Sequence, residues 1–236
     1  MILTVAPLLR RLVAVEGVPA DRPRRSGCDT CGTPLGPTGP LRAVSPLARC
    51  AGCGVRLGAA PFAVELLLLL AVAVLLLADR PGPETLAFAW FAGCAVPLVL
   101  IDLAVHRLPD RLTCPAAGGT LALLGLAALL GDDLGAWRRA LLAGVGAAVL
   151  FALTTVLFGR RGFGLGDAKL ALSAVAVLGW LGWSAVVVGL TLAFLGSALC
   201  GLALLLARRI GWRDHLPFGP FLIVGTFGAL ALSSGW

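Results

Sequence analysis

Charged residues are scarce in this chain. They make up 13% of its 236 residues, with a single lysine, and tyrosine is absent. Hydrophobic residues make up 59%, and the mean hydropathy is +0.97. A soluble domain of this length could not keep so much apolar surface from water, so the composition excludes an ordinary globular domain. The shortage of lysine and tyrosine is typical of a GC-rich bacterial genome and says nothing about function.

The net charge of +7 would suggest nucleic-acid binding in a soluble protein. Here the basic residues lie mostly in the N-terminal segment and in short loops between apolar runs. No basic stripe is interleaved with aromatic residues. We therefore expect no nucleic-acid partner and interpret the charge as a signal of membrane topology.

What the chain does have is long apolar runs. They are continuous rather than alternating, which predicts membrane helices, because lipid leaves the backbone only helices or closed barrels. The fifth run is short and interrupted by Gly179 and Gly182, so we expect it to need tilt or local thinning of the bilayer. The predicted fold class is an all-α polytopic membrane protein of about seven spans, near residues 61–78, 85–103, 113–131, 138–158, 168–181, 184–207 and 217–234.

Three regions follow from this pattern. Residues 1–20 are too short and too charged to span, which predicts an interfacial helix or the tail of a span that begins upstream. Residues 21–60 are polar and rich in proline and glycine, and hold four of the seven cysteines. Residues 61–236 form the membrane domain.

Arginine is distributed unevenly between the two sides. If residues 21–60 are cytoplasmic, the same side carries Arg107, Arg111, Arg160, Arg161, Arg208, Arg209 and Arg213. The opposite loops carry Arg80, with Arg138 and Arg139 at the edge of a span. The excess predicts a membrane protein whose cysteine segment is cytoplasmic.

The cysteine segment contains a metal-binding pattern. Cys28 and Cys31 form one C-x2-C pair, and Cys50 and Cys53 form a second. Between the two pairs lie 18 residues, and each pair is followed by a glycine. Two such knuckles place four thiolates around one tetrahedral zinc, which would be structural because no coordination position stays open. Free or redox-active thiols are the alternative, whereas a reducing cytoplasm disfavours disulfides.

Two aspartates border predicted spans. Asp102 ends the second span and Asp167 opens the fifth, so the expected topology puts both at the cytoplasmic rim. Charged groups in membrane segments usually mark functional sites. Two carboxylates held together share a proton, as in aspartic proteases, where one activates water and the other protonates the carbonyl oxygen or the leaving amine.

Simpler roles exist for these polar residues. Asp167 and Asp110 could each cap a helix N-terminus. Asp102 is placed unfavourably at a helix C-terminus, which indicates a function or a specific partner. His106 could be that partner, a substrate contact or, the interpretation we prefer, a plain interfacial residue.

The glycine-rich stretch "GFGLGD", residues 162–167, leads into Asp167. Gly164 and Gly166 could bring the backbone close to an extended substrate strand or let the chain bend. Nucleotide binding is a weaker explanation, because no strand precedes the glycines and no Walker lysine follows.

These blocks together resemble bacterial type IV prepilin peptidases, membrane aspartic peptidases of the GxGD group. The likeness lies in the cysteine box leading into residues 61–67, in "IDLAVHRLPDRLT" at 101–113, in "GLGDAKLALSAVAVLGWLGW" at 164–183 and in "LPFGPFL" at 216–222. The resemblance implies that Asp102 and Asp167 are the catalytic pair. It gives Asp110 and Lys169 supporting roles.

The same resemblance implies a substrate. Family members remove the basic leader from prepilins or pseudopilins at the cytoplasmic face, and the apolar helix after the leader can lie in lipid beside the enzyme. Many also methylate the new N-terminus with S-adenosylmethionine. A full span usually precedes the cysteines in that family, whereas residues 1–16 stand in its place here, so methylation is less firmly implied than cleavage.

Two alternatives come from other classes. A proton- or metal-coupled transporter with a regulatory zinc knuckle would need carboxylates near the bilayer midplane and an internal repeat, and the sequence indicates neither. A noncatalytic scaffold would tolerate replacement of either aspartate apart from effects on stability.

Overall fold

The computed structural model describes residues 2–19, 21–36, 39–40, 43–80, 82–131, 133–158, 164–209, 211 and 216–233, without the side chains of residues 2–4 and 158. Within these ranges there are isolated β-bridges in the cysteine segment but no strand. The helices are α1 (Ile2–Glu16), α2 (Ala63–Leu77), α3 (Thr85–Val105), α4 (Asp110–Gly131), α5 (Leu134–Phe158), α6 (Leu165–Leu181), α7 (Trp183–Leu206) and α8 (Gly219–Leu232).

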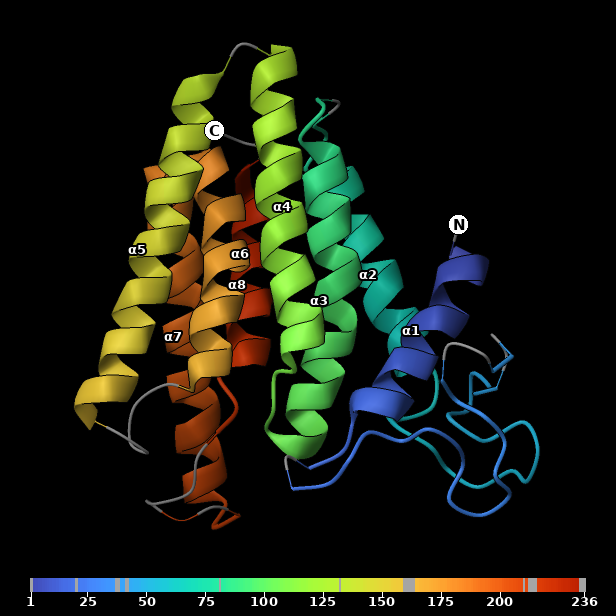
Figure 1. Ribbon diagram of the computed structural model, residues 1–236. Coiled ribbons are helices and arrows are strands. Elements are labelled where there is room, and N and C mark those ends of the chain that lie inside the picture. Colours follow the sequence, from blue (N-terminus) through green and yellow to red (C-terminus); the bar gives the residue numbers. More distant parts are fainter. Residues whose placement is uncertain are drawn as a thin grey trace.

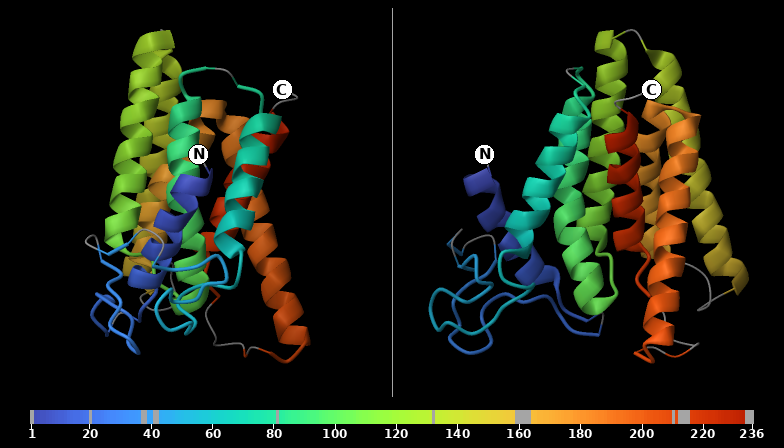
Figure 2. Two further views of the ribbon diagram at one scale, coloured as in Figure 1. Left: turned by 90° about the vertical axis from the view of Figure 1, so that its right-hand side faces the viewer. Right: turned by 180° about the vertical axis from the view of Figure 1, so that it is seen from behind.

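Helices α2 to α8 coincide with the seven predicted apolar runs and stand side by side as an up-and-down bundle (Figures 1 and 2). Of the described helices, α3, α4, α5 and α7 are long and apolar enough to cross a membrane, and α2 and α8 are shorter apolar helices. The all-α prediction is therefore confirmed, with four candidate membrane spans.

Helix α6 is the centre of the bundle. It contacts α3, α4, α5, α7 and α8, and Leu170 and Leu178 along it are fully buried. The outer helices expose apolar side chains as well, such as Leu150 and Val187, which are 60% and 65% exposed. Helices that are apolar on both their inner and outer faces are typical of proteins whose solvent is lipid.

Helices α5 and α6 approach each other through small residues. A Cβ added to Gly144 would lie 2.6 Å from the carbonyl oxygen of Leu172, and one added to Gly179 would lie 2.8 Å from the Cβ of Ala143. Close backbone approach of this kind is how helices associate in lipid, where the hydrophobic effect no longer drives their contact.

Helices α6 and α8 are both shorter than a bilayer core is thick, and arginine side chains cap their C-terminal ends. With 17 and 14 residues, they are about 25 Å and 21 Å long, whereas a bilayer core is about 30 Å thick. Arg139 donates hydrogen bonds to the carbonyl oxygens of Gly179 (3.0 Å) and Trp180 (3.1 Å), and Arg80 donates to that of Ser233 (3.1 Å). These bonds satisfy carbonyls that lipid could not.

Helix α1 connects the cysteine segment to the bundle. It contacts α2 and α3, and Arg10 forms an ion pair with Glu65 of α2 at 3.3 Å, with side chains only 10% and 23% exposed. On its other side Ala14 packs with buried Leu35 and Val44 in a small core of the cysteine segment. The segment is thus attached to the bundle through α1 (Figure 1).

Some predicted features lie outside the described residues. They are Gly162 of the glycine-rich stretch and three of the arginines used to predict the orientation, Arg160, Arg161 and Arg213.

Candidate active site and metal centre

One end of the bundle gathers the predicted carboxylates. Helix α3 ends there, and α4, α6 and α8 begin there (Figure 1). Asp102 lies in the last turn of α3 and is 4% exposed. Asp167, half-buried, lies in the first turn of α6. The two carboxyl groups are close enough to interact electrostatically.

Asp102 also faces the start of α8. A Cβ added to Gly219 would lie 2.7 Å from Oδ2 of Asp102, so any larger residue would displace the carboxylate from its present position. That oxygen is buried and makes no well-aligned hydrogen bond among the described residues, although the backbone N–H of Gly219 favours the charged carboxylate. A buried carboxylate oxygen with so little hydrogen bonding is rare in a folded protein and needs an explanation, such as a role in catalysis.

Helix ends supply an electrostatic reason for this placement. The C-terminal end of α3 disfavours a negative charge at Asp102, whereas the N-terminal ends of α6 and α8 carry partial positive charge. Because Gly219 is the first residue of α8, that favourable end faces the carboxylate directly. A negative charge is therefore better tolerated here than the position on α3 alone would indicate.

The carboxylate of Asp167 makes the predicted cap contact. Its Oδ2 accepts a hydrogen bond from the backbone N–H of Gly164 at 3.1 Å, and Gly164 is the residue that precedes α6. The structural interpretation of Asp167 is therefore confirmed. This cap contact is compatible with a chemical role for Asp167, because the hydrogen bond uses only one of the two carboxylate oxygens.

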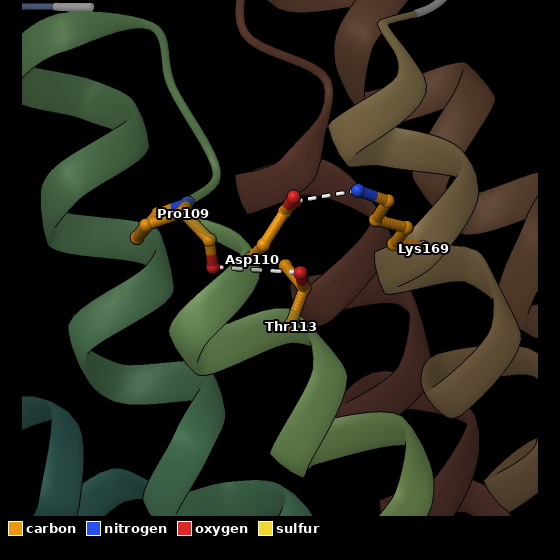
Figure 3. Close-up of polar contacts among 4 residues, drawn as sticks. All are labelled: Pro109, Asp110, Thr113 and Lys169. Carbon is orange, nitrogen blue, oxygen red and sulfur yellow. Dashed lines mark hydrogen bonds and ion pairs between the residues drawn. The ribbon is translucent and has the colours of Figure 1, made fainter.

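Asp110 and Lys169 form an ion pair between helices (Figure 3). Nζ of Lys169 donates to Oδ1 of Asp110 at 2.6 Å, and the first turn of α4 also carries a bond from Oγ1 of Thr113 to the carbonyl oxygen of Pro109. The carboxylate of Asp110 lies in the first turn of α4, where a helix N-terminus favours it. Its described partner is nevertheless a residue far away in the sequence. This contact holds the start of α4 against α6.

His106 ends α3 through its backbone. It has a φ of 52° and donates its N–H to the carbonyl oxygen of Asp102 at 2.9 Å. Its side chain is exposed. The geometry fits the interfacial interpretation, with the backbone, not the imidazole, next to the carboxylate site.

The two glycines before Asp167 differ in their surroundings. A Cβ on Gly166 would lie 2.9 Å from Cβ of Leu108, in the loop between α3 and α4, whereas one on Gly164 would lie no closer than 3.4 Å to Oδ2 of Asp167. Gly164 has an ordinary φ of −69° and is exposed. Gly166 is therefore required for close packing, and Gly164 is not.

The four cysteines of the two C-x2-C pairs converge. Cys28 and Cys53 have sulfurs 3.6 Å apart, as do Cys31 and Cys50, and all four sulfurs lie within 4.8 Å of one another. Four sulfurs at about 2.3 Å from a tetrahedral zinc would be about 3.8 Å apart. The cluster can therefore hold one metal ion, as the spacing predicts.

The two knuckles have the same backbone. The N–H of Gly32 donates to the carbonyl oxygen of Cys28 and that of Gly54 to Cys50, each at 2.9 Å. Both glycines have positive φ, 70° and 73°, a conformation that glycine adopts without strain. The glycine after each pair thus closes the turn that directs both thiols inward.

Ionisation of these thiols is uneven. Burial opposes ionisation of Cys50, but backbone hydrogen bonds from Gly52 and Cys53 outweigh it and lower the pKa of its thiol to about 6. Despite a backbone hydrogen bond from Val55, burial and the neighbouring thiols raise the pKa of Cys53 to about 12. Four thiolates side by side therefore need a cation.

Comparison with protein families matches residues 86–206 to the type IV leader peptidase family, a range that contains both Asp102 and Asp167. The chain belongs to this family. It is 37% identical over 216 residues to a protein of Aeromonas salmonicida, covering 87% of this chain and 70% of that one. It is 35% identical over 223 residues to one of Burkholderia pseudomallei, covering 89% and 67%.

A third relative, from Pseudomonas aeruginosa, is 31% identical over 218 residues, covering 87% of this chain and 70% of its own. All three relatives are named prepilin leader peptidase/N-methyltransferase. No solved structure matches the chain. The resemblance to this family read from the motifs is thereby confirmed.

Sequence reasoning missed two residues of the site. Gly219 lies in the block "LPFGPFL", which carried part of the family resemblance, but nothing in the block says that this glycine faces Asp102. Leu108, which packs against Gly166, was an unremarked part of the 101–113 block. A glycine that opens an apolar helix was the available signal for Gly219.

Proposed function

We propose that this protein is a membrane aspartic endopeptidase that cleaves the basic leader from type IV prepilins or pseudopilins. The observation that carries the proposal is the meeting of Asp102 and Asp167 at one end of the bundle, brought by helices from distant parts of the chain. Membership of the type IV leader peptidase family and the names of the relatives support it.

In this mechanism the two carboxylates divide the work. One is ionised and takes a proton from water, which attacks the carbonyl carbon of the scissile bond. The other donates its proton to the carbonyl oxygen, and later a proton passes to the leaving amine. The buried Oδ2 of Asp102 makes no well-aligned hydrogen bond among the described residues, so it retains the capacity to bind a water molecule or, when protonated, to donate to the substrate carbonyl.

The proposed setting is the bacterial inner membrane, with α2 to α8 as seven spans and the cysteine segment in the cytoplasm. Arg107, Arg111, Arg208 and Arg209 lie on the side of the cysteine segment, whereas on the far side Arg80 and Arg139 are engaged in capping helices. The positive-inside rule then favours a cytoplasmic carboxylate site.

A structural zinc is proposed for Cys28, Cys31, Cys50 and Cys53. Sulfur spacing and the paired knuckles support it. When bound, the metal would supply the cohesion that the small core of this segment lacks, and a full set of four thiolates leaves no position for catalysis.

Methylation of the new N-terminus is the second proposed activity, supported by the relatives' names. S-adenosylmethionine carries a carboxylate and an amine, so it needs charged partners of both signs. An open cleft of about 480 Å³ between the cysteine segment and the α3–α4 loop offers them, lined among others by Glu16, Arg22, Arg107 and Asp110.

The transporter alternative is not favoured. Both aspartates lie in terminal turns at the same end of the bundle, where they could not relay protons or ions across the membrane midplane. The relatives' names point to a peptidase.

The direct test is coexpression with a prepilin from the same genome. Membranes with the protein should convert the prepilin to a form shortened by its leader, seen as a mobility shift and located by N-terminal sequencing. Membranes without it give the unprocessed control. A prepilin that stays full-length beside well-inserted protein would contradict the proposal.

The same substitution should have different effects at the two glycines before Asp167. Gly166→Val should lower leader cleavage at least about tenfold, because its side chain must displace Leu108 at an overpacking cost of about 1–3 kcal/mol. Gly164→Val adds the same atoms at an open position, so the rate of leader cleavage should stay within about threefold of wild type. The energetic cost of this side chain should be less than about 1 kcal/mol. Initial rates on one prepilin would measure both. Equal losses would mean that the stretch acts as a substrate-binding strand, as the sequence suggested.

A further inference from the structure

An apolar groove runs along the bundle between α2, α3 and α8. It measures about 340 Å³ and is lined by apolar side chains and glycine. Buried Ala71, Val99 and Ile223 form its floor, and Leu70 and Val224, 53% and 68% exposed, form its edges. Nothing in the described part of the chain fills it.

The groove leads to the carboxylates. Val99, in the groove floor, lies one helical turn before Asp102 on the same face of α3. On α8 the stripe Gly219, Ile223 and Phe227 repeats every four residues, with the last two in the groove and the first against Asp102. Both rows of groove residues therefore lead, one turn further on, to Asp102 of the proposed catalytic pair.

The dimensions fit a helix lying on the surface. The groove wall from Ile223 to Ala231 is about 12 Å long, or roughly two turns. One turn of a helix about 10 Å wide occupies about 400 Å³, so a whole helix cannot enter. It would press a row of side chains into the groove, as amphipathic helices do in helix-in-groove recognition.

We propose that this groove receives the first turns of the apolar helix that follows the scissile bond of a prepilin, an assignment that rests on the proposed function. A substrate bound here runs parallel to α8, with its leader emerging beyond Gly219 on the side of the cysteine segment. A few extended residues then cross the carboxylates, because the groove begins one turn away from them. Packing against small residues such as Ala71 holds the helix, since lipid gives no hydrophobic drive.

Photo-crosslinking tests the position. A photoreactive amino acid at Val224, on the groove edge, should form an adduct with full-length prepilin in membranes when Asp167→Asn keeps the substrate uncut. The same amino acid at Leu153 on α5, which is 50% exposed and far from the groove, should give at least about tenfold less. This readout does not require cleavage.

Groove filling tests the consequence. Ala71→Phe should lower kcat/KM for leader cleavage about tenfold or more by occupying the floor. Ala73→Phe adds the same ring two residues on, about 200° around the helix, at an exposed position, and should stay within about twofold. Protein amount and monodispersity in detergent check that both variants insert.

The outcomes distinguish the two proposals. Equal adducts at Val224 and Leu153, lipid adducts alone at Val224, or equal activity of the two phenylalanine variants would overturn the groove while wild-type cleavage leaves the peptidase intact. Absence of wild-type cleavage would overturn the peptidase. A Val224-specific prepilin adduct would in that case keep the groove as a binding site.

Discussion

Asp102→Asn and Asp167→Asn should each abolish leader cleavage, with a loss of about 1000-fold or more, while the protein still inserts and purifies. Asparagine keeps the shape of aspartate but can neither carry the charge that activates water nor donate the proton that the leaving amine needs. General acid–base catalysis contributes about 10²–10⁴-fold, and the two groups act as one unit. Single-turnover cleavage of a purified prepilin would measure the loss.

Asp110→Asn provides the matched control, because it makes the same change at the same end of the bundle. Its ion pair with Lys169 is solvent-exposed, with side chains 67% and 44% accessible, and exposed pairs contribute about 1 kcal/mol or less. Cleavage should therefore fall no more than about fivefold. Wild-type activity in either Asp102→Asn or Asp167→Asn would remove the aspartyl mechanism.

Replacing Cys28 and Cys31 together with serine should eliminate metal binding and unfold residues 21–60. Purified wild-type protein should hold about one zinc per chain. The small core around Leu35 and Val44 could not hold the segment alone, since structural zinc binding contributes about 10–16 kcal/mol in comparable small sites. Elemental analysis and limited proteolysis of the segment would show both effects.

A second double variant controls for the loss of two thiols. Cys114→Ser with Cys200→Ser removes two cysteines that lie in α4 and α7, outside the cluster. It should keep its zinc and its resistance to protease. A full metal content in the Cys28→Ser, Cys31→Ser protein would refute the four-thiolate site.

Hydropathy was sufficient to locate the bundle helices, because long apolar runs have few other stable conformations in lipid. Hydropathy located the first residues of these helices less accurately. Helices α4 and α6 begin three residues before the predicted spans, since hydropathy penalises Asp110 and Asp167. A helix N-terminus favours the same carboxylates through its partial positive charge.

The candidate site likewise has features that the sequence predicts and features that it does not. The placement of Asp102 and Asp167 at the same end of the bundle followed from counting spans, because two crossings, an even number, separate the end of α3 from the start of α6. The contact of Gly219 with Asp102 and the pairing of Asp110 with Lys169 depend on how each helix is rotated about its axis. A sequence that is apolar on every face of a helix does not indicate how the helix is rotated about its axis.

Helix α8 is anchored at both of its ends. At the far end Arg80 donates a hydrogen bond to the carbonyl oxygen of Ser233. At the near end Phe218, which is 7% exposed, packs against the rings of Phe151 and Phe194, with ring centroids 5.7 Å and 5.0 Å away. Gly219 follows Phe218 directly, so the aromatic cluster and the arginine together fix the wall that faces Asp102. This side of the carboxylate site therefore keeps its shape without any contribution from a bound substrate.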